Sequence, residues 1–508
     1  MTTSKAPVTA PAPGESGPDQ GRIPAFLSWC MVAATVAWSL RELRAAVAAV
    51  AYPDDNSLHQ QMVRFATAQL RAGHDPLTTW FPYLGLGSPQ FMHYQSAPAI
   101  LTGLAGLVIG PDAAFRWSEY LLWCLWPIAI YGAARVFRLS RLAAGFAAVV
   151  APLLHSAPAI GYEQHAYLWA GYGVWTQLWA SWTLPLAWAL TWRAAADRRF
   201  IGPAAGLVAL TAALHFETGY LAFLGVLLLP LMAPGELRSR LARAAVTLLA
   251  ALLACAWVVV PLLIYARWAG LNQALAGTPM RDGYPLPELL SWLVRGDIFD
   301  QQRWPVVSLL VGAGLVAAVG WRRGGPGRAL AVLLGASLLV AAGRASFGGL
   351  VSVIPGSQDL FFRRFLMGAQ LAGIFLAGLG AAELAGHAAR LAATAAGWLR
   401  RRDLGWLSWA PAAVAVAAGA IYLVPAWPST ADLASANAAD VGFQQLAQAD
   451  EPQVAAAAAV IRRHGPGRVY AGSPSNWGRT SGSGSCPCTP TWRAWTWTRS
   501  ATPCERRR

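Results

Sequence analysis

The chain of 508 residues has few charged residues: they make up 12% of it, whereas hydrophobic residues make up 56%. Cysteines are also few, and Cys30, Cys124 and Cys255 fall inside apolar runs, so we infer neither disulfides nor a cysteine metal site. The sequence lacks the phosphate-binding glycine loops of the Walker and Rossmann types, the zinc motif HExxH, paired CxxC and the nucleophile motif GxSxG. These absences argue against a protein driven by nucleotide hydrolysis, a zinc hydrolase and a serine hydrolase.

Apolar runs of membrane length are what the sequence has in abundance. With 25 tryptophans and a mean hydropathy of +0.41, the chain has the composition of a polytopic membrane protein. Its net charge of +15 could indicate nucleic-acid binding, but most arginines lie in short clusters between apolar runs. That is the positive-inside pattern, so we expect the lipid bilayer as a partner and no nucleic acid.

The expected fold is an all-α membrane bundle whose first span covers about 23–51, longer than the ~20 residues that a bilayer needs. Later spans are expected at 116–137, 142–158, 178–195, 200–215, 217–233, 242–265, 304–321, 328–343, 365–384 and 406–427. The pair 200–215 and 217–233 can instead be one broken helix. The connections that carry arginine clusters then alternate onto one side, which is the cytoplasmic side.

Segment 98–110 is too short to cross comfortably and is expected to be an interfacial helix. This gives about eleven spans in the cell membrane, with the N-terminus cytoplasmic and the C-terminus outside. The Pro-, Gly- and Ser-rich residues 1–22 are expected to be a disordered cytoplasmic leader.

The membrane domain, 23–427, precedes a stretch of different character. Residues 428–479 are expected to begin an outer soluble domain, with a helix at 454–465 and a strand at 467–478. From 480 to 508 no helical or strand period remains, so we expect a disordered, out-of-frame tail and a truncated outer domain; the alternative is a natural, disordered basic tail.

The longest polar segment before the tail is the outer loop 52–97. An acidic pair, Asp54 and Asp55, follows the first span, with His59, His93 and Tyr94 further along. The expected topology places other candidate binding residues on the same outer side: Glu163 and His165 in 161–175, His215 and Glu217 between two short spans, and Arg363 and Arg364 in 344–364. The alternatives are a solvated loop that caps the bundle and, for His215 and Glu217, a satisfied structural pair.

These residue types favour group transfer. A carboxylate can deprotonate an acceptor hydroxyl, and an arginine can hold a phosphate bidentately. Since there is no ATP outside the cell, an activated donor there would be carried by a lipid. Two adjacent acids can also coordinate a divalent metal, but no third ligand is identifiable, so no cofactor or metal site is predicted.

The order of these features resembles the GT-C superfamily of integral-membrane glycosyltransferases: a first span, a long outer loop opening with an acidic pair, an interfacial helix and a bundle of spans. More narrowly, YPDDNSLHQQ, AGHDPL, LGSPQFMHYQSAP and FFRRFL resemble the bacterial YfhO-like branch, over roughly 24–427. That branch overlaps membrane proteins labelled "6-pyruvoyl-tetrahydropterin synthase-related", a label that would mislead here because a pterin synthase is a soluble enzyme with a histidine metal site.

The resemblance implies transfer, with inversion, from a polyprenyl-phosphate sugar to a glycan or lipid acceptor of the envelope. It assigns the base to Asp54 or Asp55, and Arg363 and Arg364 would stabilise the departing phosphate. For these arginines the alternative is snorkelling to lipid headgroups. His59 and His93 would position donor or acceptor, with a structural role as the alternative.

Other functions remain open from the sequence. A transporter or flippase for a lipid-linked saccharide is favoured by Arg41 and Glu42 in the first span, although no internal repeat accompanies them. A non-catalytic scaffold of an envelope assembly complex would use the same outer loops to bind a partner.

Overall fold

The computed structural model describes residues 22–50, 55–83, 87–156, 175–265, 275–301, 303–320, 325–407, 410, 414, 422, 425–447 and 451–463. Within these ranges the regular secondary structure is helical, apart from isolated bridges between Phe81 and Ser88 and between His155 and Asp300, which confirms the all-α class. Several expectations concern residues outside the described ranges: Asp54, Glu163, His165, the leader up to residue 21, most of the span 406–427, the strand 467–478 and the tail 480–508.

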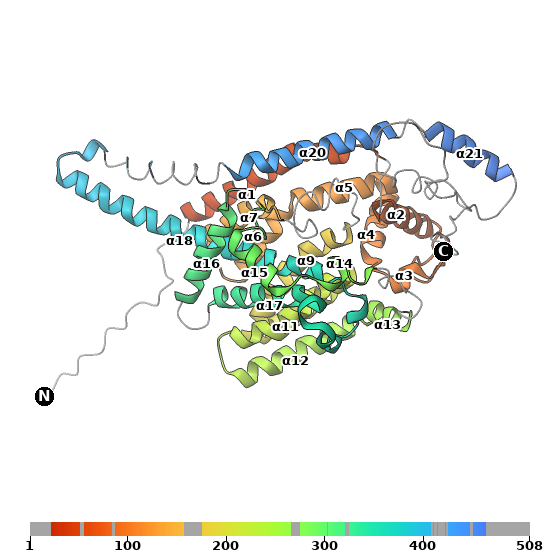
Figure 1. The fold of residues 1–508 in the computed structure, drawn as a ribbon, viewed down its shortest axis with the longest axis horizontal. Helices are drawn as coiled ribbons and strands as arrows, with labels where there is room; N and C mark the ends of the chain where they lie inside the picture. Colours follow the sequence, from red (N-terminus) through yellow and green to blue (C-terminus); the bar gives the residue numbers. More distant parts are fainter. Residues whose placement is uncertain are drawn as a thin grey trace.

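The first half of the chain contains the polar segment 52–97 and helices that come before and after it. Its elements are α1 (Arg22–Glu42), η1 (Arg44–Val47), α2 (Asp55–Arg71), α3 (Gln90–His93), α4 (Ala97–Ile109), α5 (Pro111–Cys124), α6 (Trp126–Val136), α7 (Arg141–Val150), η2 (Ala151–Leu153) and α9 (Trp175–Ala196). Helices α2, α3 and α4 gather at one end of the molecule, on the right in Figure 1. The helix expected at 98–110 is therefore present as α4.

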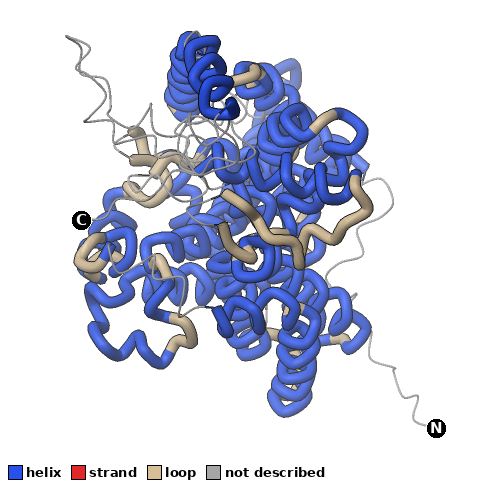
Figure 2. The backbone as a smooth tube through the Cα atoms, turned by 90° about the vertical axis from the view of Figure 1, so that its right-hand side faces the viewer, coloured by secondary structure: helices blue, strands red, loops and turns tan. Residues whose placement is uncertain are grey.

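The second half completes the bundle. Its elements are η3 (Arg198–Phe200), α10 (Ile201–Leu214), α11 (Phe216–Met232), α12 (Leu237–Ala254), α13 (Ala256–Tyr265), α14 (Pro279–Asp282), α15 (Leu286–Arg295), α16 (Val306–Gly320), α17 (Pro326–Phe347), η6 (Gly348–Val353), η7 (Ser357–Asp359), η8 (Phe362–Phe365), α18 (Leu366–Arg401), η9 (Gly405–Leu407), α20 (Ala426–Ala447) and α21 (Glu451–Arg463). Helix α21 covers most of 454–465, and α20 runs beside α1 (Figure 1). Figure 2 shows how completely helices make up the described chain.

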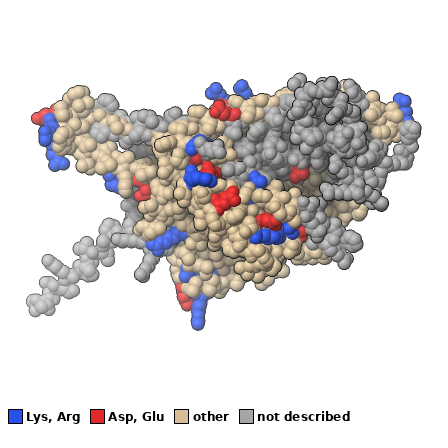
Figure 3. Space-filling model, viewed as in Figure 1, with Lys and Arg blue, Asp and Glu red and all other residues tan. Residues whose placement is uncertain are grey.

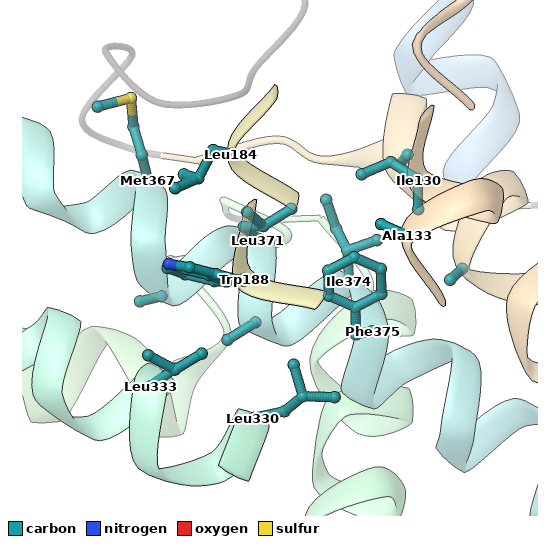
Figure 4. Packing of buried hydrophobic residues seen from close by; sticks show 14 of the residues in the cluster. Ile130, Ala133, Leu184, Trp188, Leu330, Leu333, Met367, Leu371, Ile374 and Phe375 are labelled. Carbon is teal, nitrogen blue, oxygen red and sulfur yellow. The ribbon is translucent and has the colours of Figure 1, made fainter. Parts of the chain in front are cut away.

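The first half of α18 forms the centre of the bundle, and its residues from Leu366 to Gly380 are buried. Glycines allow the neighbouring helices to approach closely, because a Cβ at Gly314 of α16 would overlap the backbone of Leu376. Figure 4 shows side chains of α6, α9, α17 and α18, among them Trp188 and Phe375, converging on this core. Burial on all sides explains why this stretch is apolar apart from Gln370, which donates to the Ser156 hydroxyl at 3.0 Å.

Two helical segments, Pro326–Val353 and Phe362–Arg401, are long and apolar enough to cross a membrane. The pair α12 and α13, bent by 67°, makes a third if it is taken as one span, and shorter apolar helices include α4 and α11. Figure 3 shows charged side chains in small groups on a surface that consists mainly of other residue types. Composition and helix lengths thus fit a membrane protein whose spans are often broken.

The breaks explain the difference from the expected run of about eleven continuous spans. The expected span 116–137 is divided at Leu125, between α5 and α6. By contrast, His215, whose backbone is extended with φ −152°, lies at the boundary expected between 200–215 and 217–233. At such breaks, backbone groups lose their helical partners, so polar side chains are needed to satisfy them inside the protein.

Candidate active site

Asp55 begins α2, where the positive end of the helix dipole stabilises a carboxylate. Its side chain has an edge that is accessible to solvent, but the surrounding protein excludes much of the water around the carboxyl group. This desolvation raises the pKa of Asp55, and the positive charge of Arg364 opposes the increase. The fold therefore brings the acidic residue of the first outer loop within electrostatic reach of the arginine that precedes α18.

His59 lies one turn further along α2 and is 1% exposed. Its ring lies 6.1 Å from that of Tyr94 and 5.5 Å from that of Trp175, measured between centroids. Burial, together with the negative charges of Asp55 and Glu217, raises the pKa of Tyr94 to about 12. Tyr94 consequently remains a neutral hydroxyl near Asp55 at physiological pH.

Gln95 joins the outer loop to two helices of the bundle. Its Nε2 donates to the Tyr94 hydroxyl at 3.2 Å and to Thr176 Oγ1 at 2.9 Å, while its Oε1 accepts from the backbone N–H of Phe216 at 3.0 Å. Gln95 thus caps the start of α11 and holds Tyr94 in place. We did not predict this residue from the sequence, because an amide in a polar loop has no periodic or motif signal.

His215 occupies the break between α10 and α11 and is 2% exposed. Its Nδ1 accepts from the backbone N–H of Thr218 at 3.1 Å, which makes His215 the N-cap of α11. The same Nδ1 atom lies 2.7 Å from the Thr218 hydroxyl oxygen. Two polar groups of Thr218 therefore hold the His215 ring at the start of α11.

Arg364 lies opposite His215 and Glu217. Its Nη1 is 3.3 Å from Glu217 Oε2 and 3.3 Å from His215 Nε2, and its guanidinium carbon lies 5.3 Å from the centre of the Phe361 ring. Glu217 Oε1 also accepts from the backbone N–H of Phe361 at 2.7 Å, which fixes the start of η8. The buried Nε of Arg364 has no hydrogen-bond acceptor among the described residues.

One buried donor of Arg364 is thus unused at this point. The Nε2 atom of His215 and Nη1 of Arg364 lie within hydrogen-bond distance of each other, which holds the guanidinium in place. The unused buried Nε–H of this guanidinium provides a place for an anionic oxygen. The arrangement can hold a phosphate beside the Asp55 carboxyl group.

Arg363 and His93 lie apart from this group. Arg363 packs over the ring of Tyr284, with its guanidinium carbon 5.9 Å from the ring centre. It diverges from Arg364 because successive residues of a 3₁₀ helix project about 120° apart. His93 ends α3 with its ring 6.2 Å from that of Tyr265, and burial lowers the pKa of His93.

The structure brings six of the predicted site residues together through ring contacts or electrostatic interactions: Asp55, His59, Tyr94, His215, Glu217 and Arg364. Asp54, Glu163 and His165, which share the sequence prediction, lie outside the described residues. In the described part of the chain, no group of three or more His, Cys, Asp and Glu side chains is arranged to hold a metal ion.

Comparisons with known proteins bear on the fold. No protein-family model matches the sequence, and no curated protein matches it. Among solved structures, the apo oligosaccharyltransferase of Archaeoglobus fulgidus matches with a TM-score of 0.51 and 12% identity, over 82% of this chain. The oligosaccharyltransferase AglB from Archaeoglobus fulgidus, in complex with an inhibitory peptide and a dolichol-phosphate, matches with a TM-score of 0.51 and 13% identity, over 81% of this chain.

This chain spans little more than half of the archaeal enzyme, since each match covers 56% of that protein. ArnT from Cupriavidus metallidurans, bound to undecaprenyl phosphate, matches with a TM-score of 0.48 and 15% identity, over 88% of this chain and 83% of that one. The likeness shows that the described chain shares the fold of the archaeal oligosaccharyltransferase over about four fifths of its length.

Proposed function

We propose that the protein transfers a sugar from a polyprenyl-phosphate donor to a hydroxyl of an envelope glycan or lipid. The observation that carries this proposal is the convergence of Asp55, His215 and Arg364, from separate parts of the chain, on a GT-C fold. The archaeal oligosaccharyltransferase with this fold is seen in complex with a dolichol-phosphate, a lipid phosphate of the same chemical class.

The reaction uses Asp55, or Asp54 next to it, as a general base. The carboxylate accepts the proton of the acceptor hydroxyl, and the hydroxyl oxygen forms a bond to the anomeric carbon of the sugar. The bond between that carbon and the phosphate oxygen breaks, and the electron pair leaves with the lipid phosphate. Attack from the face opposite the phosphate inverts the configuration of the anomeric carbon.

Arg364 and His215 stabilise the leaving phosphate. The Nε–H of Arg364, which has no acceptor among the described residues, supplies a donor where negative charge develops, and His215 positions the guanidinium through its Nε2 contact with Nη1. Glu217 orients the guanidinium through the 3.3 Å ion pair. His59 is buried against Tyr94 and supports the position of that ring.

The orientation in the membrane follows from the arginine clusters. We place the N-terminus in the cytoplasm, the C-terminus outside and the site on the outer face of the cell membrane, in a protein of the YfhO-like branch. Against a flippase stands the position of the Arg41–Glu42 pair: its side chains are 79% and 26% exposed at the end of α1, rather than buried along a passage.

The proposal is tested by transfer from polyprenyl-phosphate sugars in proteoliposomes. The wild type should form a product that Asp54→Asn/Asp55→Asn does not form, with insertion and thermal unfolding unchanged. Translocation of the lipid-linked sugar without product formation would indicate a flippase, and neither activity would indicate a scaffold.

A further inference from the structure

Helix α2 is held on α5 through one polar face. Asn56, Gln60 and Arg64 are spaced by four residues and therefore lie on the same side of α2. Arg64 Nε lies 2.6 Å and Gln60 Nε2 3.2 Å from Asp112 Oδ1, and Asn56 Nδ2 donates to Glu119 Oε1 at 3.0 Å. This row of contacts, which we call the polar ladder, ends directly beside Asp55.

The two ends of the polar ladder differ in burial. At the far end, the side chains of Arg64 and Asp112 are 33% and 43% exposed, so this ion pair adds only about 0–1 kcal/mol. At the near end, Asn56 and Glu119 are 2% and 1% exposed. The near contact is therefore the one that a substitution would disturb most.

At the near end, the surroundings of Asn56 and Glu119 suit an amide paired with a protonated carboxylic acid. No cation lies within 4.0 Å of Glu119 among the described residues, and the buried Oδ1 of Asn56 has no donor there. An ionised carboxyl group would be costly in this setting. A protonated Glu119 would accept from Asn56 Nδ2 and donate its hydroxyl to Oδ1, which satisfies both residues.

We propose that Glu119 is a positioning residue that fixes the first turn of α2 through Asn56 and thereby aims the Asp55 carboxyl group. This inference rests on the proposed role of Asp55 as base. Glu119 does not touch substrate; it acts by limiting where Asp55 can lie relative to Arg364. A displacement of about 1 Å at a reacting group can cost about a hundredfold in rate.

The test compares Glu119→Gln with Glu119→Leu in the full-length protein in nanodiscs. Glutamine can accept from and donate to the Asn56 amide, so Glu119→Gln should keep kcat within about threefold of the wild type. Glu119→Leu should lower kcat by about tenfold or more with KM unchanged. Asp112→Asn, at the exposed end of the polar ladder, is the matched control and should change kcat by less than about threefold.

Hydrogen exchange of the amides in the first turn of α2 supplies a readout that does not depend on activity. Exchange should be faster in Glu119→Leu and unchanged in Glu119→Gln and Asp112→Asn. If Glu119→Leu does not fold, Asn56→Leu/Glu119→Leu replaces both partners with apolar groups and should show the same faster exchange and lower kcat.

The proposal is overturned if the leucine variants exchange and turn over like the wild type, or if Glu119→Gln is as impaired as Glu119→Leu. An Asp55→Asn variant that retains transfer would instead overturn the role of Asp55. In that case the exchange experiment would still show whether Glu119 orders α2, so the two failures are distinguishable.

Discussion

Replacing Arg364 should lower both stability and kcat, each through the loss of a different interaction. The side chains of Arg364 and Glu217 are 14% and 10% exposed and lie 3.3 Å apart. Arg364→Gln leaves Glu217 as a buried charge without its cation, which should lower the free energy of unfolding by about 3–5 kcal/mol. Loss of the donor to the leaving phosphate should lower kcat by about a hundredfold to a thousandfold.

A double substitution separates these effects. Arg364→Gln/Glu217→Gln removes both charges, so no carboxylate is left unpaired and most of the lost stability should return. The kcat should stay as low as in the single variant, because the guanidinium is still missing. Thermal unfolding in detergent and the rate of sugar transfer measure the two quantities.

Arg363→Gln provides the comparison, since Arg363 has no carboxylate within 4.0 Å in the described part of the chain. Its free energy of unfolding should change by less than about 1 kcal/mol. A double variant that regained both stability and wild-type kcat would refute the assignment of Arg364 to the phosphate.

The remaining predictions concern pH and topology. Because burial raises the pKa of Asp55 while Arg364 opposes the increase, kcat/KM should fall with decreasing pH at a value above the usual ~3.9 of aspartate. In Arg364→Gln this acidic limb should move to higher pH, and a shift to lower pH would contradict the assignment of the base. In a cysteine-free background, impermeant reagents applied outside should label cysteines at the exposed positions Ala72 and Ser435 but not at Pro234. Labelling at Pro234 would reverse the proposed orientation.

Much of the fold could be predicted from hydropathy. Long apolar runs located the helices of the bundle, and the shortness of 98–110 identified α4 correctly as a helix of less than membrane length. The break at His215 lies where the sequence divides 200–215 from 217–233. The breaks at Leu125 and Cys255 could not be located, because each depends on which neighbouring side chains satisfy the interrupted backbone. Hydropathy averages over such single positions.

The candidate site was predictable only in part. Asp55, His215 and Glu217 had a signal, since ionisable residues next to apolar spans are costly. Glu119 is also an ionisable residue, and it lies inside the expected span 116–137. A search of every expected span for ionisable residues would therefore have found it. The pair Arg363 and Arg364 could not be separated from sequence, because their divergence depends on the 3₁₀ turn that precedes α18.

The central claim is that a carboxylate of the first outer loop is the base for transfer from a lipid phosphate. The most direct measurement is single-turnover transfer from a polyprenyl-phosphate sugar by wild type, Asp54→Asn, Asp55→Asn and the double variant. One single variant and the double variant should lose about a hundredfold or more in rate while donor binding is retained. Wild-type rates in the double variant would contradict the claim.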